Sequence, residues 1–136
     1  MRGGEVIELI GDLGSGKTQL VRGLAKGISS RDQVQSPSFT IARVYRGKKD
    51  INIHHFDFHR LKDPGVVAQE LVEVIGQPKT VTVIEWSDPV KEVLPRQRLR
   101  IEFMITGAKS RLIRFTANNQ RYKRLIRDLL AFNKHL

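Results

Sequence analysis

The feature that most constrains this chain is a glycine-rich segment near its start, Gly11–Thr18, which reads GDLGSGKT. An apolar run from Val6 to Ile10 precedes it, and a helix-like run from Gln19 to Lys26 follows it. This order of strand, glycine turn and helix is the setting in which the pattern G-x-x-x-x-G-K-T binds phosphate. Glycines allow positive φ angles and a close approach of the backbone to a ligand. The segment therefore predicts a phosphate-binding loop, and with it nucleotide binding.

Each part of this loop has an expected task. The backbone N–H groups of residues 14–18 are expected to face the phosphates, and the start of the following helix adds favourable partial charge. Lys17 is placed to reach the β- and γ-phosphates, and the Thr18 hydroxyl is placed to ligate Mg²⁺. The nucleotide-binding residues expected around the loop are Leu13, Gly14, Ser15, Gly16, Lys17, Thr18 and Gln19.

Length and composition favour one folded domain. With 136 residues and 40% apolar side chains, the chain can bury a sizeable core, so we expect a single domain over residues 1–136. The absence of cysteine, of a membrane-length apolar run and of a signal-peptide core favours a cytoplasmic protein without a membrane partner. The net charge of +10 favours polyanionic partners such as RNA, DNA or an acidic protein face, with a merely solvated basic surface as the open alternative.

The remaining chain predicts an α/β fold with a mixed sheet. Two pairs of alternating segments, 39–45 with 51–58 and 99–106 with 111–117, indicate antiparallel hairpins. The β-branched run at 80–86 is typical of a central strand, and the C-terminal residues 119–136 form an amphipathic helix with a basic, solvated face. Strands are expected at 5–10, 39–45, 51–58, 80–86, 99–106 and 111–117, and helices at 17–26, 64–75, 87–95 and 119–136.

Two carboxylates stand where a phosphate loop needs partners. Asp57 comes at the end of a hairpin strand, and Glu85 ends the buried strand, at the edge where open α/β sheets bind ligands. Because Mg²⁺ takes carboxylate oxygens, we expect a metal site of Thr18, Asp57 and Glu85 and catalytic roles for Lys17, Asp57 and Glu85. The structural alternatives are a turn cap or an Arg60 ion pair for Asp57, and an ion pair with a lysine for Glu85.

Other polar residues give weaker signals. His54 and His55 point to opposite faces of a strand and cannot easily share a metal ion, so packing or hydrogen-bonding roles are favoured. The indole of Trp86 is more typical of a core or lid residue than of a ligand contact. The segment Ser36–Thr40 is a candidate loop for sensing the γ-phosphate, with Thr40 as a second hydroxyl ligand.

Taken together, these motifs resemble a known family. The segments Gly11–Thr18, Ser36–Thr40, His54–Leu61, Ile84–Trp86 and Leu94–Pro95 occur in the order seen in the TsaE (YjeE) family. The joint pattern covers roughly residues 5–116 and is far more specific than the phosphate loop alone. The resemblance implies a P-loop NTPase-like three-layer fold with a mixed central sheet. Only ten residues precede Gly11, whereas the family usually has a strand and a helix there, so the expected fold is N-terminally short.

The resemblance also implies an activity. It implies an ATPase that uses ATP and Mg²⁺, is slow alone and is stimulated by its partners. It would support the TsaB–TsaD complex in placing threonylcarbamoyl on the adenosine beside the tRNA anticodon, with tRNA contacted indirectly or through the basic surface. Matching positions add Thr40, in a switch-like loop, and Arg111, a basic residue approaching the nucleotide. A small P-loop kinase and a basic nucleic-acid-binding module with a vestigial nucleotide site are the alternatives.

Overall fold

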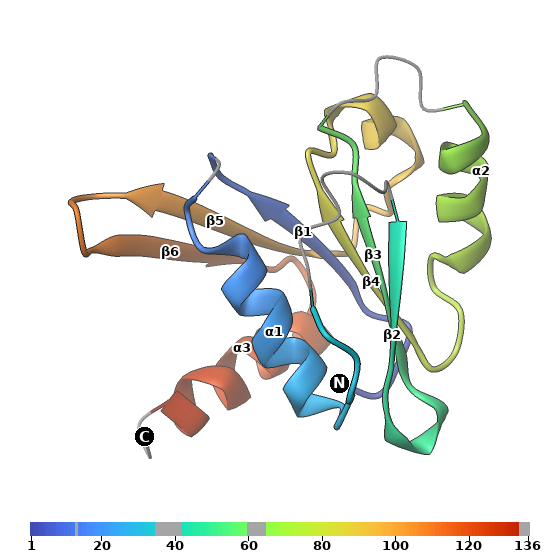
Figure 1. Cartoon of the computed structure of the whole chain (residues 1–136), viewed down its shortest axis with the longest axis horizontal. Helices are drawn as coiled ribbons and strands as arrows, with labels where there is room; N and C mark the ends of the chain where they lie inside the picture. Colours follow the sequence, from blue (N-terminus) through green and yellow to red (C-terminus); the bar gives the residue numbers. More distant parts are fainter. Residues whose placement is uncertain (13, 35–41, 60–64, 134–136) are drawn as a thin grey trace.

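The chain folds around one mixed β-sheet (Figure 1). The computed structural model describes residues 1–12, 14–34, 42–59 and 65–133. Two short 3₁₀ helices, η1 and η2, accompany the α-helices and strands. In chain order the elements are β1 (Val6–Ile10), α1 (Lys17–Gly27), β2 (Ala42–Arg46), η1 (Lys48–Asp50), β3 (Asn52–Asp57), α2 (Gly65–Val74), β4 (Thr80–Glu85), η2 (Asp88–Val93), β5 (Leu99–Ile105), β6 (Arg111–Thr116) and α3 (Gln120–Asn133).

The order of the strands decides where the site lies. The sheet runs β2-β3-β4-β1-β5-β6, and its inner pairs β3–β4, β4–β1 and β1–β5 are parallel. The outer pairs β2–β3 and β5–β6 are antiparallel, which confirms both predicted hairpins. The strand predicted to be central, β4, lies between β1 and β3. Because β1, β3 and β4 are parallel, their carboxyl ends meet at one edge of the sheet.

Helices cover both faces of the sheet, which confirms the expected three layers (Figure 1). One face packs against α1 and α3, whose Val21, Leu24 and Tyr122 join a core with the inward side chains of the strands. The other face packs against α2 and η2 through Leu71 and Val90. Side chains alternate between the two faces along each strand, so both faces of the central strands are buried. Among the described residues, no helix combines the length and apolar character needed to cross a membrane.

The helix α3 is tied to the sheet by one buried hydroxyl. The Tyr122 hydroxyl accepts a hydrogen bond from the Val6 N–H at 2.9 Å, and the Asn119 side chain accepts one from the Tyr122 N–H at 2.9 Å. We expect Tyr122→Phe to lower the free energy of unfolding by about 1–2 kcal/mol, because it leaves a buried backbone donor without its acceptor. Urea unfolding checks this, and an unchanged free energy with an unchanged m-value would contradict it.

Some element ends differ from the prediction. The first helix was expected over residues 17–26, but Gly27 is also helical, and the left-handed residue is Ser29 with φ 61°. The reason is packing: Ile28 continues the hydrogen-bond ladder to Leu24 and is buried in the core, so the chain turns only after it. The expected helix at 87–95 is the 3₁₀ helix η2. The starts predicted for α2 and for the second strand lie outside the described residues.

Candidate nucleotide-binding site

A cavity of about 370 Å³ lies at the edge where β1, β3 and β4 end. The loop after β1 and the start of α1 form one side of it, and the ends of β3 and β4 form the other. Sequence reasoning expected these segments to meet, and the parallel register brings them together. The cavity is lined by Gly14, Gly16, Lys17, Thr18, Gln19, Asp57, Glu85 and Trp86.

The loop has the backbone that an anion cradle requires. Gly14 and Gly16 have φ angles of 78° and 112°, a region that residues with a side chain rarely adopt. Gly16 directly precedes α1 and provides no side chain to cap the first N–H groups of the helix. No described side chain caps these groups, so they can donate to a ligand, and the helix dipole favours a negative charge there.

Lys17 is held in the cavity although it carries a charge. Its side chain is buried, and Nζ donates to the Gly11 carbonyl at 2.5 Å. The same nitrogen lies 4.8 Å from the centroid of the Trp86 ring, which adds a cation–π contact. A carbonyl and an indole compensate a buried ammonium only in part, so an anionic phosphate would be a stronger partner.

The two carboxylates lie side by side. Asp57 and Glu85 are partners in the parallel register of β3 and β4, and both are buried. The Glu85 Oε2 atom lies 2.8 Å from His55 Nε2, so Glu85 has a histidine as its hydrogen-bond partner, where an ion pair with a lysine was considered. The predicted hydrogen-bonding role of His55 is confirmed. Sequence alternation places His55 and Asp57 on the same face of their strand. Only the register of β3 against β4 shows that both lie next to Glu85.

The surroundings of Asp57 disfavour its charged form as long as no cation is bound beside it. Burial raises the pKa of its carboxyl, and the neighbouring Glu85 raises it further, while the His59 N–H bond at 2.9 Å, the His59 ring and Lys17 lower it. The net pKa lies above its ordinary value. The hydrogen bond from the His59 N–H also shows that Asp57 caps the turn after β3, as one of the structural alternatives proposed. A divalent cation between the two carboxylates would relieve their repulsion, so this donor set fits Mg²⁺.

The carboxylates alone would not complete a metal site. Within the described ranges, no three His, Cys, Asp or Glu side chains gather closely enough to hold an ion. Mg²⁺ retains several water or phosphate ligands in most proteins, and Thr18 supplies a hydroxyl on the same cavity. The fit to Mg²⁺ therefore depends on phosphate oxygens as well as on Thr18, Asp57 and Glu85.

The other expected site residues have mixed outcomes. Arg111, at the start of β6, reaches the loop: its Nη2 lies 3.4 Å from the Gly14 carbonyl, and its Nη1 donates to the Gly107 and Ser110 carbonyls. The Ser15 side chain is buried, and within the described part of the chain its Oγ has no hydrogen-bond partner. Leu13 and Thr40 lie outside the described residues.

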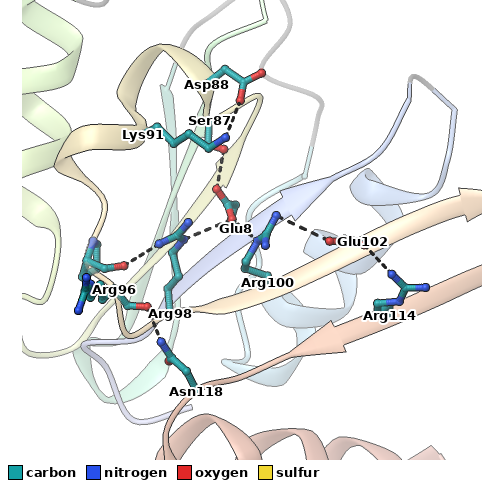
Figure 2. A network of polar contacts seen from close by, with 11 residues as sticks. Glu8, Ser87, Asp88, Lys91, Arg96, Arg98, Arg100, Glu102, Arg114 and Asn118 are labelled. Atoms are coloured by element: carbon teal, nitrogen blue, oxygen red, sulfur yellow. Dashed lines mark hydrogen bonds and ion pairs between the residues drawn. The ribbon is translucent and has the colours of Figure 1, made fainter.

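A buried polar network beside the loop was missed by sequence reasoning. Glu8, in the middle of β1, accepts hydrogen bonds from Ser87 Oγ at 2.6 Å, Arg100 Nε at 2.9 Å and Arg98 Nε at 3.3 Å (Figure 2). Its side chain is 1% exposed. The available signal was an acidic residue inside the apolar run VIELI, because an unpaired carboxylate there would be costly.

This network makes a pH dependence testable. Burial raises the pKa of Glu8, but the Ser87 hydrogen bond, Arg98 and Arg100 together hold it below its ordinary value. Because the folded pKa is depressed, the stability from Glu8 is present above its unfolded pKa and is lost as pH falls through the folded pKa. We expect Glu8→Gln to lower the free energy of unfolding by about 1–3 kcal/mol at neutral pH and by less in acid. Urea unfolding at a series of pH values checks this, and parallel pH profiles for the two proteins would contradict it.

The glycine loop between a central strand and a helix, facing carboxylates at the ends of parallel strands, defines a protein of the P-loop class. The profile of the family described as "Threonylcarbamoyl adenosine biosynthesis protein TsaE" matches residues 1–113. The chain belongs to this TsaE family, which confirms the resemblance in its sequence.

Relatives and a solved structure agree with this assignment. The tRNA threonylcarbamoyladenosine biosynthesis protein TsaE of Bacillus subtilis is 35% identical over 93% of this chain and 78% of its own length. Its namesake from Treponema pallidum is 35% identical over 81% of this chain and 80% of its own length. The crystal structure of Bacillus subtilis YdiB superposes with a TM-score of 0.79 at 32% identity, covering 98% of this chain and 81% of that one.

Proposed function

We propose that this chain binds and hydrolyses ATP with Mg²⁺ and thereby supports a TsaB–TsaD complex in the threonylcarbamoylation of tRNA. The observation that carries the ATPase part is the convergence of Lys17, Thr18, Asp57 and Glu85 on one cavity beside a glycine loop. The relatives' names link the family to tRNA threonylcarbamoyladenosine biosynthesis. The partners TsaB and TsaD follow from the family resemblance and are part of the proposal.

The residues divide the work by their chemistry. The N–H groups at the start of α1 and the Lys17 ammonium would hold the phosphates. Thr18, Asp57 and Glu85 would hold Mg²⁺, which when bound supplies positive charge against the phosphoryl oxygens. The Glu85 carboxylate, fixed by His55 at 2.8 Å, would orient the attacking water. Arg111 adds positive charge next to the loop.

Phosphate release from ATP tests this proposal. We expect slow release by the chain alone and faster release with TsaB–TsaD, because the described residues that line the cavity include a lysine but no arginine. Lys17→Ala serves as the inactive control. No release with the partners present would contradict the ATPase proposal.

Two other outcomes would favour the alternatives. Transfer of the phosphate to a small acceptor in place of water would identify a kinase. Salt-sensitive tRNA binding that survives Lys17→Ala, without hydrolysis, would identify a nucleic-acid-binding module, for which the net charge of +10 is the supporting observation.

A further inference from the structure

Trp86 borders two cavities. It lines the cavity of the phosphate loop and also a second cavity of about 340 Å³ next to η2. The second cavity is lined on its other sides by Glu8, Asp12, Ser87 and Arg100, among others. Because Trp86 borders both cavities and is only half-buried, its neighbours enclose it incompletely, and packing alone does not account for its position. Some other restraint must hold it against Lys17.

The backbone at Trp86 needs such a restraint. Its φ of 55° is left-handed, an uncommon conformation for a bulky residue, and it persists only where the flanking residues are held firmly. On the preceding side, Glu85 is fixed: its carbonyl accepts the Phe58 N–H at 3.1 Å and its carboxylate contacts His55. The restraint on the following side must come from Ser87.

Ser87 is anchored to the centre of the sheet. Its Oγ donates to Glu8 Oε2 at 2.6 Å (Figure 2). Its carbonyl accepts the Val90 N–H at 2.9 Å. Glu8 is itself immobilised by Arg98 and Arg100 on β5. A buried hydrogen bond to a carboxylate is short and strong, so Ser87 is a firm end point for the turn at Trp86.

We propose that Glu8 is a positioning residue for the nucleotide site: through Ser87 it fixes the left-handed turn at Trp86 and keeps the indole beside Lys17. The His59 ring, 4.6 Å from the indole, supports the same position from another side. The effect on ATP binding rests on the function proposed above, whereas the placement of Trp86 by Glu8 does not.

The variant Ser87→Ala tests this placement. It removes the donor and leaves the pairing of Glu8 with both arginines intact. Trp86 is the single tryptophan of the chain, so its fluorescence reports on this position alone. In the protein without nucleotide we expect a red-shifted emission and stronger quenching by acrylamide. With Mg²⁺ and ATP we expect calorimetry to give an affinity roughly tenfold weaker, the usual effect of losing a hydrogen bond to a charged group.

Matched variants separate positioning from general damage. Ser87→Thr keeps the hydroxyl and is expected to restore both readouts. Lys91→Ala breaks the exposed Lys91–Asp88 pair at 3.6 Å on the wall of the same cavity and is expected to change neither. Glu8→Gln weakens the hydrogen bond between Ser87 and residue 8 and keeps a side chain of the same size. This variant takes the place of Ser87→Ala if Ser87→Ala does not fold.

The outcomes also distinguish the inference from the proposed function. Wild-type emission and quenching in folded Ser87→Ala, or in Glu8→Gln where that variant replaces it, would overturn the inference. Shifted emission that Ser87→Thr restores supports it even if the wild-type protein binds no ATP, a result that would reject the proposed function alone.

Discussion

We expect Lys17→Ala to abolish the proposed ATP hydrolysis and to weaken binding of ATP with Mg²⁺ by about 10- to 100-fold, as for the loss of a hydrogen-bonded charge pair with phosphate. The reason is the position of the ammonium. Lys17 Nζ donates to the Gly11 carbonyl and lies beside the Trp86 ring. Among the described residues, no carboxylate forms a hydrogen bond or ion pair with it. Its charge is therefore available to the phosphates in the ground state, and its loss affects affinity as well as rate.

Calorimetry and phosphate release measure the two parts of this result. Lys26→Ala is the matched control, because it removes the same charge from an exposed position on the same helix. It should leave both quantities within about twofold, as is usual for surface substitutions. Equal affinity in Lys17→Ala and Lys26→Ala would exclude Lys17 from phosphate binding.

Glu85 is expected to separate catalysis from binding. Glu85→Ala should lower hydrolysis by roughly 100-fold or more, the contribution typical of a group that activates water, while affinity changes little. The structural reason is that Glu85 is buried at the end of β4, faces the cavity and is oriented by His55 at 2.8 Å. It contacts the ground-state phosphates less directly than Lys17, which lies within the loop itself.

A second variant guards against a folding defect. Glu85→Ala leaves His55 buried without its partner, whereas Glu85→Gln keeps the shape and a hydrogen-bonding group. Both should be inactive in single-turnover assays, and Glu92→Ala, an exposed glutamate on η2, should be active. Unchanged turnover in Glu85→Ala would remove this residue from the mechanism.

The sequence predicted the parts of the site that have local patterns. The glycine loop, the helix α1 and the strand β4 have local patterns, and the carboxyl ends of parallel strands always meet at one edge. Asp57 and Glu85 could therefore be expected close together before the structure was known. Their adjacency in the register of β3 and β4 agrees with that expectation.

The polar contacts that support the site could not be predicted in the same way. Glu8 meets Arg98 and Arg100 across about 90 positions of the chain, and local pattern does not encode such a contact. The pairing of His55 with Glu85 depends on exact register, and the left-handed turn at Trp86 depends on anchors on both sides. Long-range contacts decide all three, so the structure was needed to find them.

Calorimetric titration of the purified chain with ATP and with GTP, each with Mg²⁺, tests the central claim that the Gly11–Thr18 loop grips a triphosphate. We predict saturable heat of binding for at least one nucleotide, reduced strongly by Lys17→Ala and unchanged by Lys26→Ala. Heat that is absent for both nucleotides in the folded wild-type protein, or that is the same in Lys17→Ala, would contradict the claim.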